Sequence, residues 1–127
     1  MIDGYTDVAV VVSDAQKARK WYVEKLGFKV DLDRGHAICV GPNVSEGGIF
    51  LHLCGDNYAP LEPGNTGIGF NAGDFDRTCD DMEARVKFSM CTNEDGYKVA
   101  KFLDLDGNEF WLFESSLAKR VRKDSAE

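Results

Sequence analysis

The sequence predicts an α+β fold built from two tandem βαβββ modules. Two observations support this prediction: the same order of elements occurs twice, and a shift of 60 residues superposes the halves without a gap. Because the identities at this shift are few, the repeated order carries more weight. The identical pairs are Gly4/Gly64, Thr6/Thr66, Asp14/Asp74, Phe28/Phe88, Gly47/Gly107 and Phe50/Phe110. We expect one domain over residues 1–127, with module one at 5–55, a linker at 56–65, module two at 66–115 and a basic tail at 116–127.

The first module opens with a β-branched run, Tyr5–Val12, that is typical of a strand. Ser13 is the expected N-cap of a helix over Asp14–Leu26, and Gly27 ends this helix. Apolar side chains recur at helical spacing and predict one buried face, made of Ala18, Trp21, Tyr22 and Leu26. Three short strands follow, at residues 28–33, 36–40 and 48–54.

The second module repeats this order after a linker at 56–65 that holds two of the three prolines. A strand at 67–72 leads into a helix that opens at Gly73-Asp74 and runs to about Val86, with Phe75 in the core. Three strands are expected at 88–92, 97–104 and 109–114. The turn before the last strand is Asp104-Leu105-Asp106-Gly107-Asn108, in which Gly107 supplies a positive φ.

Composition and charge narrow the range of partners. Apolar residues make up 43% of the chain, and the longest unbroken apolar run is Val8–Val12, so we expect no membrane span. The N-terminus lacks the basic and apolar layout of a secretion signal, which predicts a cytoplasmic protein. Without the tail Lys119–Lys123, residues 1–118 hold 11 basic and 20 acidic side chains, a net charge of −9. This charge argues against nucleic acid as a partner, and the basic run is interpreted as a solvated terminus.

The four cysteines form no C-x-x-C pair. In a reducing compartment we expect all of Cys39, Cys54, Cys79 and Cys91 to be buried thiols that pack as small apolar groups. An alternative is a soft-metal site, because His52 and Cys54 share one face of a predicted strand and Cys39 lies on a nearby strand.

Two segments carry a resemblance to a known family. Asp7–Asp14, with Trp21-Tyr22 and Leu26–Val30 behind it, resembles the opening of the vicinal-oxygen-chelate superfamily, and Phe102–Leu112 resembles its closing strand-turn-strand. That superfamily contains glyoxalases, extradiol dioxygenases and bleomycin-resistance proteins. The resemblance implies a curled, cup-like mixed sheet with helices outside. In the enzymes of the family, a divalent ion in the cup chelates adjacent oxygens of the substrate.

The resemblance also implies four metal-ligand positions, and few of them hold ligands here. The first falls on Asp7 and the second on His52 or Leu51. The third falls on Gly67 or Ile68, and the last, usually a glutamate, falls on Trp111. Since a transition-metal site generally needs three or four ligands, we expect no metal cofactor. The alternative is a weak divalent-metal site on Asp7 and His52, with His36 or Glu114 substituting after a register shift.

The metal-free branch that includes bleomycin-resistance proteins is therefore the preferred resemblance. It implies a homodimer that binds a small, cationic or aromatic molecule and needs no catalytic residue. The expected ligand-binding residues are Asp7, His52, Asn71, Trp111 and Phe113. Trp111 and Phe113 would form an aromatic floor, or else fill a cavity that has closed.

Two other function classes remain open. One is an enzyme of the same superfamily, either a metal-dependent lyase, isomerase or dioxygenase with non-standard ligands, or a metal-free enzyme with His52 as a general base beside Asp7. The other is a structural domain whose cavity has collapsed.

Overall fold

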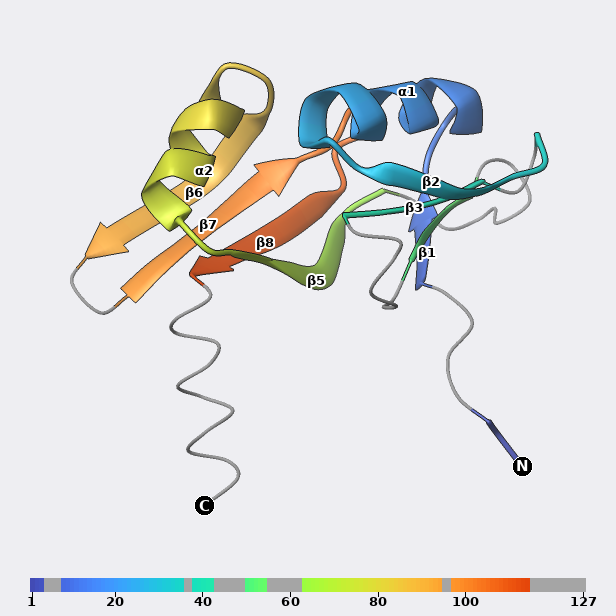
Figure 1. The fold of residues 1–127 in the computed structure, drawn as a ribbon, viewed down its shortest axis with the longest axis horizontal. Helices are drawn as coiled ribbons and strands as arrows, with labels where there is room; N and C mark the ends of the chain where they lie inside the picture. The colour runs from blue at the N-terminus through green and yellow to red at the C-terminus, as the bar shows by residue number, and fades with distance from the viewer. Residues whose placement is uncertain (4–7, 36–37, 43–49, 55–62, 95–96, 115–127) are drawn as a thin grey trace. The chain divides into compact units, whose positions relative to one another are not determined.

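The structure, a computed structural model, describes residues 1–3, 8–35, 38–42, 50–54, 63–94 and 97–114 (Figure 1). The chain divides into two compact units, Met1–Gly64 and Asn65–Glu127. Each unit contains one four-stranded mixed sheet and one helix, in the order strand, helix and three strands. The α+β class and the repeated βαβββ order are therefore confirmed. The basic tail and most of the predicted linker lie outside the described residues.

The first unit consists of β1 (Val8–Val11), α1 (Ala15–Leu26), β2 (Lys29–Asp33), β3 (Ile38–Gly41) and β4 (Leu51–Cys54). The strands lie in the order β1-β4-β3-β2, with β1 parallel to β4 and the other pairs antiparallel. Buried aliphatic side chains of β1, β3 and β4 form the core together with α1. They are Val10, Ile38, Val40, Leu51 and Leu53, with Ala18 and Tyr22 of the helix.

The N-cap of α1 is Asp14, so the expectation that Ser13 caps this helix is wrong. The Asp14 carboxylate accepts hydrogen bonds from the backbone N–H groups of Gln16 and Lys17 at 3.0 and 3.1 Å. A carboxylate here also interacts favourably with the positive end of the helix dipole, which a serine hydroxyl does less well. Gly27 ends the helix with φ 70°, as predicted.

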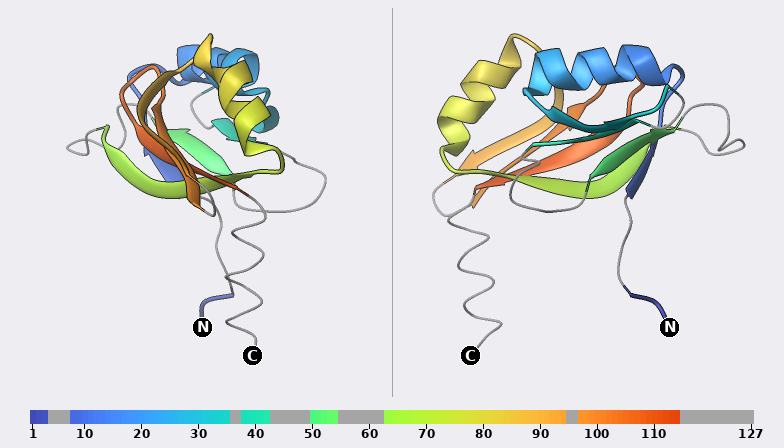
Figure 2. Two further views of the ribbon diagram at one scale, coloured as in Figure 1. Left: turned by 90° about the vertical axis from the view of Figure 1, so that its left-hand side faces the viewer. Right: turned by 45° about the vertical axis from the view of Figure 1, so that its right-hand side comes forward.

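The second unit consists of β5 (Asn65–Ala72), α2 (Phe75–Glu83), β6 (Lys87–Glu94), β7 (Tyr97–Leu103) and β8 (Glu109–Glu114). Its strand order, β5-β8-β7-β6, repeats that of the first unit, and β5 runs parallel to β8. The helix α2 lies against one face of this sheet (Figures 1 and 2). The rings of Phe70, Phe102 and Phe110 pack together on this face, with centroids 5.5 to 6.2 Å apart.

Several element boundaries differ from the predicted ones, and two of these differences have a clear cause in the hydrogen bonding. The strand β5 begins at Asn65, inside the predicted linker, because Asn65 already pairs with Glu109 of β8. The helix α2 ends at Glu83 rather than near Val86, because the N–H groups of Arg85 and Val86 both donate to the Met82 carbonyl and close a turn.

The predicted aromatic core is confirmed for two of its three members. Tyr22 and Phe75 are buried, whereas Trp21 is half-buried and packs its ring edge-on against Tyr22 with centroids 5.1 Å apart. No helix in the described part of the chain has the length and apolar character needed to cross a membrane.

The turn between β7 and β8 is held by one buried carboxylate. Asp104 is 6% exposed and accepts hydrogen bonds from the backbone N–H of Asp106 and from both the backbone and side-chain N–H of Asn108, at 2.8 to 2.9 Å. Gly107 takes the predicted positive φ of 87°. These bonds fix the length of the turn and therefore the register in which β7 pairs with β8.

Replacement of Asp104 by alanine should destabilise the protein by about 2–3 kcal/mol, because three charge-assisted hydrogen bonds are lost and the buried Asn108 amide keeps no acceptor at this position. Urea unfolding followed by circular dichroism measures the loss. The matched control, Asp81→Ala on the exposed side of α2, should change stability by less than about 0.5 kcal/mol. Equal effects of the two substitutions would contradict this role for Asp104.

Candidate functional site

The candidate site lies on the face of the second sheet opposite α2. Strand pairing defines two rows across the four strands of this face. The first row is Met90, Lys101, Trp111 and Gly69, and the second is Thr92, Val99, Phe113 and Asn71. Side chains alternate along each strand, so Phe110 and Leu112 project to the helix side while Trp111 and Phe113 project to this one.

Trp111 and Phe113 form a stacked aromatic pair on this face. Both side chains are half-buried, and their ring centroids lie 5.8 Å apart with the planes at 2° to each other. The Nζ atom of Lys101 lies 4.3 Å from the centroid of the Trp111 ring, which is a cation–π contact. The face thus combines flat apolar surface with a positive charge.

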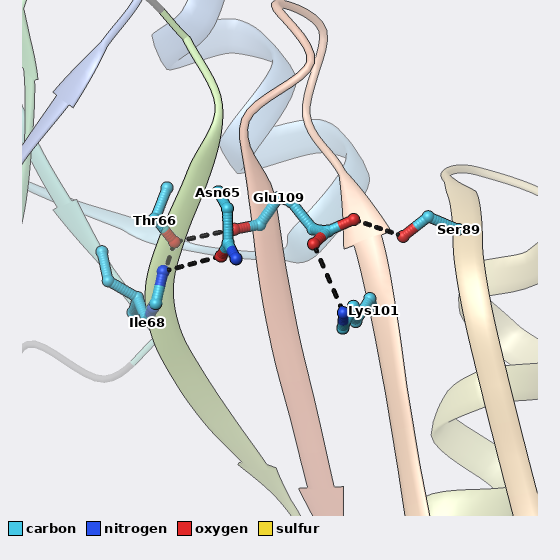
Figure 3. A network of polar contacts seen from close by, with 7 residues as sticks. Asn65, Thr66, Ile68, Ser89, Lys101 and Glu109 are labelled. Carbon is cyan, nitrogen blue, oxygen red and sulfur yellow. Dashed lines mark hydrogen bonds and ion pairs between the residues drawn. The ribbon is translucent and has the colours of Figure 1, made fainter.

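The same lysine also approaches a carboxylate. Lys101 Nζ is 3.8 Å from Glu109 Oε1, and the second carboxylate oxygen, Oε2, accepts a hydrogen bond of 2.7 Å from the Ser89 hydroxyl (Figure 3). Both ionic side chains retain solvent contact, at 25% and 21% exposure. On β8, Glu109 precedes Trp111 by two residues and Phe113 follows it by two, so the three side chains lie on one face.

A bulge in β5 shapes the edge of this face. The register between β5 and β8 shifts between Asn65 and Gly69, and Gly67 takes φ 70°. The Thr66 hydroxyl donates to the Glu109 carbonyl at 2.7 Å and accepts from the Ile68 N–H at 3.1 Å (Figure 3). The bulge therefore occupies the stretch, Gly67 or Ile68, where the resemblance places a metal ligand.

Gly69 has a specific steric role. A Cβ atom at this position would lie 2.7 Å from Cε2 of Phe113 and 3.8 Å from Cβ of Trp111. The ring of Phe113 therefore lies against the backbone of β5, and only glycine leaves it that space. In this unit, the room that glycine provides is taken by an aromatic side chain of the protein.

The structure brings together three of the five predicted ligand-binding residues. Asn71, which is exposed, pairs with Phe113, and Trp111 lies in the adjacent row. His52 is half-buried in β4 of the first unit, where it pairs with Ala9 and Cys39. Asp7 and the substitute ligand His36 lie outside the described residues.

The predicted set of ligand-binding residues lacks three members of this face: Gly69, Lys101 and Glu109. Glu109 was detectable, because it is two residues from Trp111 on one strand and therefore shares its face. Lys101 and Gly69 come from other strands, and their positions beside Trp111 follow from the register of pairing. Glu114 projects to the face opposite Trp111, as the alternation along β8 requires.

The described residues contain no group of three or more His, Cys, Asp or Glu side chains that could hold a metal ion. Cys39, His52 and Cys54 thus form no soft-metal site, and the Cys54 thiol instead donates to the His52 carbonyl at 3.3 Å. Cys39 and Cys54 are buried as expected. The expectation is wrong for Cys79, which is half-buried, and for Cys91, which is exposed because β6 is an edge strand.

Comparison with known proteins identifies the family to which the fold belongs. Residues 4–112 match the family model of the glyoxalase/bleomycin resistance protein/dioxygenase superfamily. The chain belongs to this superfamily. No curated protein matches the sequence of this superfamily member.

Solved structures of the superfamily fold are similar over most of their length. A glyoxalase/bleomycin resistance protein/dioxygenase superfamily member from Sphaerobacter thermophilus DSM 20745 is 29% identical with a TM-score of 0.74, covering 89% of this chain and 98% of its own. TnmS3, an antibiotic binding protein from Streptomyces sp. CB03234, is 24% identical with a TM-score of 0.65, and the match covers 90% of this chain and 98% of TnmS3. Lactoylglutathione lyase from Agrobacterium tumefaciens is 18% identical with a TM-score of 0.68, and the match covers 91% of this chain and 96% of the lyase.

The contact between Gly69 and Phe113 can be tested by making the same glycine substitution in the native protein and in a variant that lacks the Phe113 ring. Gly69→Ala should destabilise the native protein by about 1 kcal/mol, because the new Cβ displaces Phe113 from its stack on Trp111. In a Phe113→Ala background the same substitution should stabilise by about 0.5 kcal/mol, because only the lower backbone entropy of the unfolded chain remains. Urea unfolding of the four proteins measures both effects.

Gly73→Ala is the control for this comparison, because a Cβ at Gly73 would meet nothing within 4 Å. Its effect should be the same in both backgrounds. A Gly69→Ala effect that does not depend on Phe113 would show that the two residues are not coupled.

Proposed function

We propose that this superfamily member binds a planar aromatic small molecule, without a metal ion, on the Trp111–Phe113 face of its second unit. The observation that carries the proposal is the parallel pair of half-buried rings with a lysine ammonium beside it. Flat aromatic side chains with a few polar groups nearby are typical of sites that bind aromatic ligands.

The residue at the family's last metal position supports a metal-free site. By resemblance this position carries a carboxylate, and here it is Trp111, whose indole offers a ring face and one N–H donor but no metal ligand. The carboxylate that shares the face, Glu109, is engaged by Ser89 and Lys101. Binding, rather than metal-assisted catalysis, is what these side chains are suited to.

The position of Lys101 favours an aromatic ligand over a cationic one. Its ammonium already lies against the Trp111 ring, so a ligand cation would have to compete with it for the same contact. A ligand oxygen could instead accept a hydrogen bond from this ammonium, whose ion pair with Glu109 is long at 3.8 Å. The net negative charge of the chain opposes anions at long range, but salt screens this effect beyond about 8 Å.

The comparisons support this choice only in general terms. TnmS3 is described as an antibiotic binding protein, and lactoylglutathione lyase is an enzyme on the same fold. Their sequence identities are below one quarter, so neither passes its ligand or its reaction to this chain. The choice between a binding protein and an enzyme therefore rests on the residues of the second sheet.

Isothermal titration of the chelator-treated protein tests the proposal with two planar probes of opposite charge. Anthraquinone sulfonate should bind more tightly than proflavine, because its sulfonate can accept from Lys101. Trp111→Leu should weaken both probes about tenfold through lost ring contact. Lys101→Met should weaken anthraquinone sulfonate alone, also about tenfold, since a charge-assisted hydrogen bond is lost.

Trp21→Leu is the matched control, because Trp21 is half-buried in the first unit and lies outside this face. It should leave both affinities unchanged. Binding that resists Trp111→Leu, or that weakens equally with Trp21→Leu, would contradict the proposed site. Binding that requires an added divalent ion would favour the enzyme alternative.

We also propose that the protein acts as a homodimer in the cytoplasm, as the resemblance to bleomycin-resistance proteins implies. Light scattering at micromolar concentration should give twice the 14.1 kDa mass of one chain. A mass of one chain under these conditions would refute the dimer and leave the aromatic site as a property of the monomer.

A further inference from the structure

Two cysteines meet between α2 and β6, on the face of the second sheet opposite the aromatic pair. Phe75 of α2 is buried, with 2% of its surface exposed, and therefore faces the sheet. Cys79 lies one helical turn after Phe75, so it shares this inward side of α2. Cys91 of β6 pairs with Ala100 of β7, whose row continues to the buried Leu112 on the helix side. The helix and the edge strand therefore present one thiol each to the same space.

That space is an open cleft of about 380 Å³, and both thiols line it together with Phe75 and Phe88. Cys91 is exposed and Cys79 is half-buried, so a reagent in solution reaches Cys91 first. The Asp76 carboxylate, which accepts hydrogen bonds from Asn93 at 2.6 Å and Lys98 at 2.7 Å, ties α2 to β6 and β7 beside the thiols.

The two thiols are near enough for Cys91 to affect the ionisation of Cys79. Burial, together with the neighbouring Cys91 thiol and the carboxylates of Asp76 and Asp80, raises the pKa of Cys79 to about 12. Cys79 is therefore a protonated thiol at neutral pH. A mixed disulfide on Cys91 removes the charge contribution of Cys91 to this pKa, while burial and the carboxylates of Asp76 and Asp80 continue to raise it.

We propose that Cys79 and Cys91 form a redox-active dithiol, which a small disulfide such as glutathione disulfide oxidises to an intramolecular disulfide. The Cys91 thiolate attacks one sulfur of the oxidant, forms a mixed disulfide and releases one glutathione thiolate. Cys79 then loses its proton to water and attacks the Cys91 sulfur, which forms the internal bond and releases the second glutathione. The protein loses two electrons and two protons, and the oxidant is reduced to two thiols.

The cleft allows this bond to form within the fold. A disulfide requires the two Cα atoms to lie within about 7 Å of each other and the sulfurs to approach to about 2.0 Å, so both side chains must turn toward each other. Both thiols border the cleft of about 380 Å³, so their side chains have space to rotate toward each other. The bond would join α2 to the edge strand without involving Trp111 or Phe113, so it is independent of the proposed ligand site.

The test is incubation of the folded protein with glutathione disulfide, alkylation of the remaining thiols and peptide mapping by mass spectrometry. The expected product has the Cys79 and Cys91 peptides linked to each other, while the buried Cys39 and Cys54 are recovered alkylated after denaturation. A persistent mixed disulfide on Cys91, or four alkylated cysteines, would overturn the proposal.

Two single variants establish the order of the steps. Cys79→Ser should stop the reaction at the mixed disulfide on Cys91, and Cys91→Ser should leave Cys79 unmodified. Near-ultraviolet circular dichroism confirms that each variant is folded, and Cys79→Ala replaces any serine variant that is not. Equal reactivity of Cys79 in the presence and absence of Cys91 would contradict the proposed order.

Discussion

The candidate site depends on the register of the β7–β8 hairpin, and a single buried carboxylate holds that register. Asp104 binds the N–H groups of the turn that follows β7, so the pairing of Lys101 with Trp111 is set before any ligand is present. A slip by one residue would send Trp111 to the helix side and bring Phe110 to the open face. The stability of one turn is thus directly coupled to the composition of the binding surface.

The second sheet separates two kinds of chemistry by the alternation of its side chains. One face carries parallel rings, a lysine and a glutamate, which suit the binding of a flat molecule. The other face packs phenylalanines under α2 and, at its edge, brings two thiols together. By resemblance, the position of Trp111 carries a metal-binding carboxylate in the enzymes of the superfamily. The indole in place of that carboxylate is the reason for assigning this chain binding rather than metal-assisted catalysis.

Much of the fold could be predicted from the sequence, because local signals determine it. Gly27 and Gly107 have the positive φ values expected of them. The helix α2 begins directly after Gly73-Asp74, as expected, and α1 is capped one residue after the expected Ser13. The shared face of Trp111 and Phe113 follows from the two-residue period of a strand. What could not be predicted depends on pairing between strands: Lys101 and Gly69 are distant from Trp111 in sequence, and the bulge at Gly67 shifts the register between them. Exposure of Cys91 likewise follows from the edge position of β6, which strand order determines.

The most direct test of the central claim is a two-dimensional proton–nitrogen NMR titration of the metal-free protein, read at the indole N–H signals of its two tryptophans. A Trp21→Phe variant assigns the signals. Addition of anthraquinone sulfonate should shift the Trp111 signal and leave the Trp21 signal in place, whereas paramagnetic Mn²⁺ should broaden neither. A Trp111 signal that does not shift on addition of the aromatic probe but broadens with stoichiometric Mn²⁺ would contradict the account.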